Sequence, residues 1–153
     1  MTKTWAAVPF RNTWDREVRQ RALSWAQLVE VFTTFQTSPD GTKKQIPAWS
    51  PTIYKEGATR GKASVVGLSC LVLDYDEGKI TIPEATAAWR WRAGILHTSW
   101  SHTEEHHKFR VILPLHEPVV VSDWPGVFAW AARYTRKCIN PEEVETLEEI
   151  ATK

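Results

Sequence analysis

The sequence predicts an α+β fold in which helices cover one face of a sheet and the other face is open and polar. Three observations support this fold. An apolar, β-friendly run over 66–73 ends in Asp-Tyr-Asp, as a central strand would. Residues 108–115, KFRVILPL, alternate side chains with a period of two, which is typical of a half-buried strand. Segments with helical period and capping residues lie before, between and after these strands.

The N-terminal part is expected to form one strand, one helix and a long loop. Residues 4–10 fit a first strand. Ser24 with Gln27 is a capping-box pattern, and a helix with period 3.6 follows to about Phe35. Residues 36–62 form a Pro/Gly-rich loop, in which basic and aromatic side chains suit a nucleic acid or a nucleotide phosphate. A solvated loop anchored by a tryptophan explains the same residues.

Next along the chain, a second helix and a hairpin are expected. Pro83 fits the first turn of a helix that runs to about Arg92, with Gly94 just past its end. Residues 95–99 predict a strand in which His97 and Ser99 share a face. Since only a short polar loop separates this strand from 108–115, the two are expected to pair antiparallel.

Two helices are expected to complete the chain. Ser122 can cap a helix that runs to about Lys137, and an acidic helix from Asn140-Pro141 to the end follows it.

Composition places the chain among ordinary globular proteins, as a single domain spanning 1–153 with 42% hydrophobic residues. No stretch approaches the roughly 20 apolar residues of a membrane span, and no secretory signal is visible. Cys70 and Cys138 stand apart without a CxxC pair, which indicates reduced thiols in a cytoplasmic protein. The net charge of +1 hides an asymmetry, because residues 1–140 hold 18 basic and 13 acidic groups. This balance is compatible with a polyanionic ligand.

Two carboxylates stand at the end of the predicted central strand. Asp74 and Asp76 are two residues apart and therefore share a face, with Tyr75 on the other face. Adjacent carboxylates repel each other unless a cation or a shared proton compensates them. Mg²⁺ binds one or two carboxylates and keeps its other positions for water and phosphate. The pair predicts a divalent-metal site, although a solvated acidic turn would explain the same residues.

Two further polar sets complete a candidate triphosphate site. Ser99, Ser101 and His102 follow one predicted strand, and Lys108 and Arg110 lie on the next. Arginine offers a fork of donors that fits phosphate, and serine or protonated histidine adds hydrogen bonds.

The segments LVLDYDEG, HTSWSH and KFRVILPL resemble the archaeo-eukaryotic primase superfamily, and most of all the primase-polymerase domains of plasmid, phage and mobile-element replication proteins. The resemblance covers about 54–118. It implies an RRM-like antiparallel or mixed sheet, two-metal nucleotidyl transfer with Mg²⁺ or Mn²⁺, NTP or dNTP as substrate and a DNA or RNA template. A helicase domain or subunit beyond this chain is also implied. Asp74, Asp76 and His102 would be catalytic, with both aspartates binding metal. The nucleotide would contact Ser99, Ser101, His102, Lys108, Arg110 and Arg60.

Two departures from the family pattern matter. The family places Ser and His two residues apart, whereas here Trp100 holds that place and Ser101 adjoins His102. The family also has a third metal-binding carboxylate on a downstream strand, where this sequence offers only the acidic segment 141–151. Either the chain is an N-terminal fragment of a longer protein, or its active site is incomplete.

Two other classes of protein remain open. A haloacid-dehalogenase-type phosphatase also has Asp-x-Asp after an apolar strand, with Asp74 as nucleophile and Asp76 as acid. Against it, Glu77-Gly78 replaces the usual pair, the later lysine and paired acids are absent, and a hairpin stands where parallel strands belong. The other class is a non-catalytic nucleic-acid-binding module with an RRM-like sheet.

Overall fold

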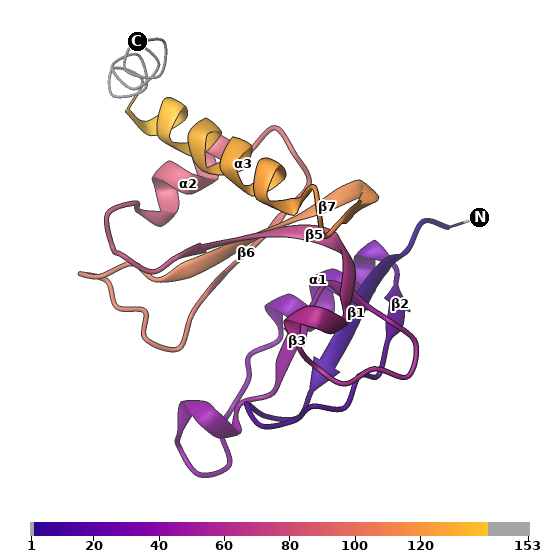
Figure 1. Cartoon of the computed structure of the whole chain (residues 1–153). Helices are drawn as coiled ribbons and strands as arrows, with labels where there is room; N and C mark the ends of the chain where they lie inside the picture. Colours follow the sequence, from indigo (N-terminus) through magenta and orange to yellow (C-terminus); the bar gives the residue numbers. More distant parts are fainter. Residues whose placement is uncertain (1, 141–153) are drawn as a thin grey trace.

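The computed structural model describes residues 2–140, which form two antiparallel sheets and three α-helices (Figure 1). The first sheet has the order β2-β1-β3, with strands Trp5–Phe10 (β1), Arg21–Leu23 (β2) and Ala48–Ser50 (β3). The second has the order β4-β5-β7-β6, with strands Thr52–Tyr54 (β4), Val65–Tyr75 (β5), Ile95–Thr98 (β6) and Phe109–Val120 (β7). The α-helices are Trp25–Thr33 (α1), Ile82–Trp89 (α2) and Trp124–Ile139 (α3), and short 3₁₀ turns span Lys43–Gln45 and Lys62–Ser64. The predicted α+β class is confirmed.

The predicted central strand is β5, which lies between β4 and β7. It is apolar because both of its faces are largely covered: Leu71 and Leu73 point to one face and Cys70 to the other, and all three are buried. β7 pairs antiparallel with both β5 and β6, so the predicted hairpin is confirmed.

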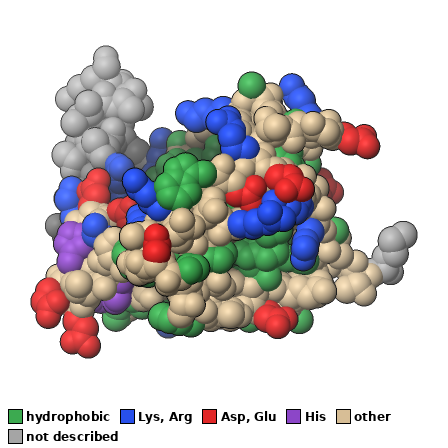
Figure 2. All heavy atoms as spheres, turned by 90° about the horizontal axis from the view of Figure 1, so that it is seen from below, with side chains coloured by type: hydrophobic (Ala, Val, Ile, Leu, Met, Phe, Trp, Pro, Cys, Tyr) green, Lys and Arg blue, Asp and Glu red, His purple; other side chains and the backbone are tan. Residues whose placement is uncertain are grey.

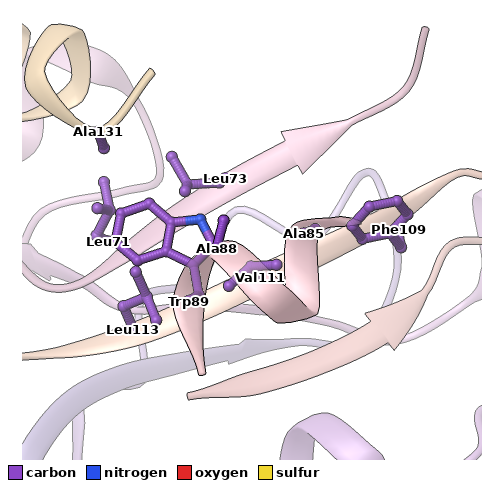
Figure 3. Packing of buried hydrophobic residues seen from close by; sticks show 9 residues of the cluster. All are labelled: Leu71, Leu73, Ala85, Ala88, Trp89, Phe109, Val111, Leu113 and Ala131. Atoms are coloured by element: carbon purple, nitrogen blue, oxygen red, sulfur yellow. The ribbon is translucent and has the colours of Figure 1, made fainter. Parts of the chain in front are cut away.

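Helices α2 and α3 pack on one face of the four-stranded sheet (Figure 3). Trp89 of α2 is 4% exposed and packs with Leu71, Leu113 and Ala131 of α3. Fully burying a large apolar side chain stabilises the fold by about 1.5–3 kcal/mol, so this cluster holds both helices against the sheet. Its buried members are Leu71, Leu73, Ala85, Ala88, Trp89, Phe109, Val111, Leu113 and Ala131.

The opposite face of the sheet is covered in part by α1 and the three-stranded sheet. Leu28 of α1 and Ala7 of β1 form a second buried cluster with Cys70, Ile95 and Ile112. The open polar face expected from the sequence is therefore confined to the end of the sheet where β5 stops and β7 begins.

The helix starts follow local signals. α1 has the predicted capping box, in which the Ser24 hydroxyl accepts from the Gln27 N–H and the Gln27 side chain accepts from the Ser24 N–H. α2 has a second box formed by Thr81 and Glu84, and it ends at Trp89, before the expected Arg92. The polar and Gly-containing stretch after it forms a turn instead.

The third helix differs from its prediction by one residue at its start. The cap of α3 is Asp123 and not Ser122, whose hydroxyl donates to the Asp123 carboxylate. The predicted acidic helix from Asn140-Pro141 onward lies outside the described residues.

The predicted loop over 36–62 is wrong in part, because it contains β3 and β4. These strands and β2 have three residues each, too few to show a period in the sequence. Their pairing partners lie far away along the chain: β3 pairs with β1, and β4 with β5. Among residues 2–140, no helix has the length and apolar character that a membrane span needs.

Candidate functional site

The site centres on a row of polar side chains across three strands. Asp74 of β5 lies opposite Arg110 of β7, and Arg110 lies opposite His97 of β6. Residues directly opposite one another in antiparallel strands put their side chains on the same face, so the three form one continuous row. We call Asp74, Arg110 and His97 the polar row.

Asp74 and Arg110 form an ion pair within this row. Arg110 donates from Nε and Nη2 to Asp74 Oδ2 at 3.2 and 3.1 Å. Both side chains are 41% exposed, and an ion pair so open to water stabilises a fold by about 0–1 kcal/mol. The Arg110 guanidinium therefore compensates the Asp74 charge. The interaction also leaves Arg110 accessible to an anionic ligand.

His97 also belongs to the row, although the sequence pattern indicates only that it shares a face with Ser99 and not that it belongs to the site. Its ring stacks on Phe32 of α1, with centroids 6.4 Å apart and planes 9° apart. Burial lowers the pKa of His97, and Arg110 lowers it further, while Asp74 and a hydrogen bond with the Thr98 carbonyl act in the opposite direction. His97 is therefore held as a neutral ring beside the ion pair. Only the packing of α1 reveals this environment.

Ser99 and Lys108 extend the ladder beyond the row. The Ser99 N–H donates to the Lys108 carbonyl at 2.8 Å, one pair further than Thr98 and Phe109. By the alternation of the two strands, both side chains belong to the face of Arg110. The structure thus brings together four of the predicted residues, namely Asp74, Ser99, Lys108 and Arg110.

Asp76 lies in the turn after β5, where its side chain is exposed. His106 donates from Nε2 to the Asp76 carbonyl at 3.2 Å. Gly78 completes this turn with φ of +71°, and a Cβ at that position would lie 2.7–2.9 Å from the His106 ring. The positive φ favours glycine at this position, and the missing Cβ leaves room for the His106 ring. It lets the β6–β7 loop pack against the end of β5.

His102 lies in the loop between β6 and β7, beside Lys108, and is not a member of the polar row. Its Nδ1 accepts from the Lys108 N–H at 3.1 Å, and its ring meets the His107 ring edge to face, with centroids 5.4 Å apart. His107 Nδ1 in turn accepts from the Ile82 N–H at the start of α2, at 2.9 Å. His102 is therefore joined directly to Lys108 and, through His107, to the start of α2. Figure 2 shows histidine and acidic side chains together at the end of the molecule where this loop lies.

The hydrogen bond to His102 Nδ1 also decides its chemistry. A ring nitrogen that accepts a hydrogen bond carries no proton, so the neutral ring carries its proton on Nε2. His102 can therefore donate from Nε2 to a phosphate oxygen. Ser101 is exposed in the same loop.

Arg60 belongs to a different part of the molecule. It donates from Nη1 to the carbonyls of Thr13 and Asp15, at 3.2 and 3.4 Å, and its guanidinium lies 4.3 Å from the centroid of the Phe10 ring. These contacts tie it to the loop after β1 and not to the polar row. The structure does not bring Arg60 together with the other predicted nucleotide-binding residues.

The carboxylates fit one ion better than two. Within residues 2–140, no group of three or more His, Cys, Asp or Glu side chains is placed to hold a metal. Asp74 and Asp76 supply two carboxylates near one strand end, which suits a single Mg²⁺ or Mn²⁺ that keeps water and phosphate oxygens as its other ligands. Asp123 lies at the start of α3, and Glu142 to Glu149 lie outside the described residues.

Comparison with known proteins gives no information about the function of this chain. No family model, no curated protein and no solved structure matches this chain.

Proposed function

We propose that the chain is a primase-polymerase-type nucleotidyltransferase domain that binds an NTP or dNTP with a divalent metal on a nucleic-acid template. One observation carries the proposal. The acidic residue at the end of the central strand lies beside an arginine, with a serine and a lysine on the same sheet face. A carboxylate for the metal and cations for the phosphates are what nucleotidyl transfer requires.

Each residue of this face has a role in the proposal. Arg110 neutralises Asp74. If the Asp74 carboxylate held a divalent ion, Arg110 would be free to bind the triphosphate. Lys108 and Ser99 hold further phosphate oxygens. His102 donates from Nε2 at the edge of the site. When bound, the ion would polarise the phosphate that is attacked and the oxygen that leaves with pyrophosphate.

The order of elements also supports the proposal. The stretch β5-α2-β6-β7-α3 is a strand, a helix, a hairpin and a helix, which is the order expected from the sequence pattern, and an antiparallel sheet with helices on one face is compatible with the RRM-like core that the resemblance over 54–118 implies.

The test is metal-dependent nucleotide binding, measured by calorimetry with Mn²⁺ and a non-hydrolysable NTP. Asp74→Asn should abolish the metal dependence, because the neutral amide is a far weaker ligand than a carboxylate. Glu117→Gln on the exposed part of β7 is the matched control and should bind as the wild type does. Equal binding by wild type and Asp74→Asn would contradict the proposal.

A second candidate is a non-catalytic nucleic-acid-binding module. It is favoured by the Asp74–Arg110 pair, since a carboxylate that already has its own cation needs no metal. In that case an oligonucleotide should bind equally well with EDTA and with Mn²⁺, and no metal-dependent nucleotide binding should appear.

A further inference from the structure

A second surface with ligand-binding character lies on the helical side of the sheet, away from the polar row. It is formed by the end of α2, the residues that follow it, and one face of α3. We call it the aromatic–arginine surface, and it consists of Trp91, Trp130, Tyr134, Arg90, Arg92 and Arg133.

The aromatic rings of this surface are exposed but fixed. Trp91 is 56% exposed and Trp130 is 50% exposed, which is unusual for so large an apolar side chain. Trp130 stacks on Tyr134, with centroids 5.7 Å apart and planes 20° apart, and Trp91 meets Tyr134 edge to face at 5.8 Å. The buried Trp89 lies beneath all three rings, 4.7 Å from Tyr134. Little conformational entropy remains to be lost when a ligand binds.

The polar edges of these rings are already satisfied within the protein. Trp91 Nε1 donates to the Ala88 carbonyl at 3.1 Å and also to the Tyr134 hydroxyl. The Tyr134 hydroxyl donates to the same carbonyl at 2.9 Å. What the rings offer to a ligand is therefore mainly apolar surface, which suits stacking rather than hydrogen bonding.

The surroundings of the rings are positively charged. Arg92 lies over Trp91, with 5.0 Å between the guanidinium carbon and the ring centroid. Arg90 and Arg133 are exposed beside it, and Arg133 is one helical turn from Trp130. Residues 85–98 and 124–139 together hold five arginines and lysines and no Asp or Glu. Arg136, one of the five, interacts electrostatically with Glu77, so the surface itself relies on the other arginines.

A hollow lies beside the buried Trp89, between α2 and the strands β6 and β7. It has a volume of about 120 Å³ and is lined by Arg90, Arg92, Trp89, Gly94 and neighbouring residues of β6 and β7. Two arginines of the aromatic–arginine surface, Arg90 and Arg92, are therefore among the residues that line a mainly apolar hollow.

We infer that the aromatic–arginine surface binds single-stranded nucleic acid, with bases on the Trp91 and Trp130 rings and phosphates on Arg90, Arg92 and Arg133. Bases of a single strand can stack on aromatic rings whatever the nucleotide sequence, and arginines neutralise the phosphate backbone. A duplex hides its base faces and would not use the rings. A second copy of this chain would bring two positively charged surfaces together and is disfavoured for that reason.

The inference stands on its own residues and does not depend on the proposed catalytic site. Stacking and phosphate contacts need neither a metal nor a nucleotide triphosphate, so binding should persist in EDTA. A failure of metal-dependent nucleotide binding would therefore leave this inference standing, and a failure of oligonucleotide binding in EDTA would leave the proposed function standing.

The experiment measures binding of a fluorescein-labelled twelve-residue oligo(dT) by anisotropy, together with quenching of tryptophan fluorescence. Arg92→Glu and Trp130→Ser should each weaken binding by about tenfold or more, the size expected for the loss of one stacked base or one phosphate contact. Binding should also weaken steeply as salt rises, with a shallower slope in Arg92→Glu.

Arg21→Glu is the matched control, because Arg21 lies over Trp49 at 6.0 Å on the three-stranded sheet. It should bind as the wild type does. Because Trp130 contacts the buried Trp89, circular dichroism must show that the Trp130→Ser variant is folded. If that variant is not folded, the Arg92→Glu variant alone still tests the inference.

Three results would overturn the inference. The first is equal affinity of wild type and Arg92→Glu. The second is an equal loss in Arg21→Glu, which would mean a diffuse charge effect. The third is concentration-dependent dimerisation in sedimentation that Trp130→Ser abolishes, because the rings would then serve a second copy of the chain.

Discussion

At the scale of single residues, the Asp74–Arg110 ion pair is the central feature of the candidate site. A carboxylate and a guanidinium held 3.1 Å apart neutralise each other, yet both remain open to water. Such a pair adds little to stability and can exchange partners when a stronger ligand arrives. The pair therefore suits a binding site better than a structural role.

The first prediction concerns Arg110→Lys. Lysine keeps the charge but cannot make the two-nitrogen contact that arginine makes with a carboxylate or a phosphate. We expect the variant to fold with a free energy of unfolding within about 1 kcal/mol of the wild type. We also expect it to bind nucleotide about tenfold more weakly, as measured by calorimetry. Unchanged affinity in Arg110→Ala would reduce Arg110 to a surface charge on the sheet.

The second prediction concerns His97 and pH. Burial lowers the pKa of His97 in the folded protein below its value in the unfolded chain, which is near 6.5. Below that value, protons bind the unfolded chain preferentially. The stabilising contribution is therefore fully present above pH of about 6.5 and is lost as the pH falls toward the lower, folded pKa.

His97→Phe isolates this effect, since phenylalanine can still stack on Phe32 but does not titrate. Urea unfolding at pH 7.5 and pH 5.5 should show a smaller loss of stability in the variant than in the wild type. The other histidines are common to both proteins, so they cancel in the comparison. An equal loss in the two proteins would show that His97 titrates normally.

At the scale of elements, helix α2 holds one group in place at each of its two ends. Its N-terminus holds His107 through the Ile82 N–H, and its C-terminus ends at Trp89 beneath the exposed rings. The helix has only eight residues, so its end groups matter more than its intrinsic propensity.

The third prediction tests that helix. Thr81→Ala removes the hydroxyl that accepts from the Glu84 N–H and should cost about 1 kcal/mol in the free energy of unfolding. Thr98→Ala, at an exposed position at the end of β6, is the control and should cost less. Guanidinium unfolding followed by circular dichroism measures both, and an equal cost would mean that the cap adds nothing.

At the scale of the whole molecule, the two proposed binding surfaces lie on opposite faces of one sheet. The polar row lies on the side of α1, and the aromatic–arginine surface lies on the side of α2 and α3. Strand β5 and strand β7 contribute to both faces, since their side chains alternate.

The fourth prediction concerns catalysis by the whole chain. Two metal ions about 3.5–4 Å apart need more ligands than Asp74 and Asp76 supply. We expect residues 1–153 to bind one ion and a nucleotide weakly, and to show little or no primer synthesis alone. Activity should appear when a longer chain or a partner supplies another carboxylate. Robust template-directed synthesis by residues 1–153 would mean that a third ligand lies within them, and Glu142 to Glu149 would be tested first.

The sequence by itself determined the local features of this protein. The apolar run of β5, the alternation of 109–113 and the Ser24 capping box could all be predicted, because period and capping depend on neighbours a few residues away. The α+β class followed from the order of these elements. Asp74 and Arg110 could likewise be placed on one face from their strand positions.

Only the tertiary structure decided the contacts between distant parts of the chain. The register of β5 against β7 put Asp74 opposite Arg110, and the packing of α1 put Phe32 on His97. Arg60, which was predicted to lie in the nucleotide site, instead lies over the Phe10 ring. The sequence could not predict this contact, because a loop without periodicity does not indicate which part of the fold it packs against. The short strands β2, β3 and β4 could not be predicted for the same reason. Their stability comes from partners that lie elsewhere in the sequence.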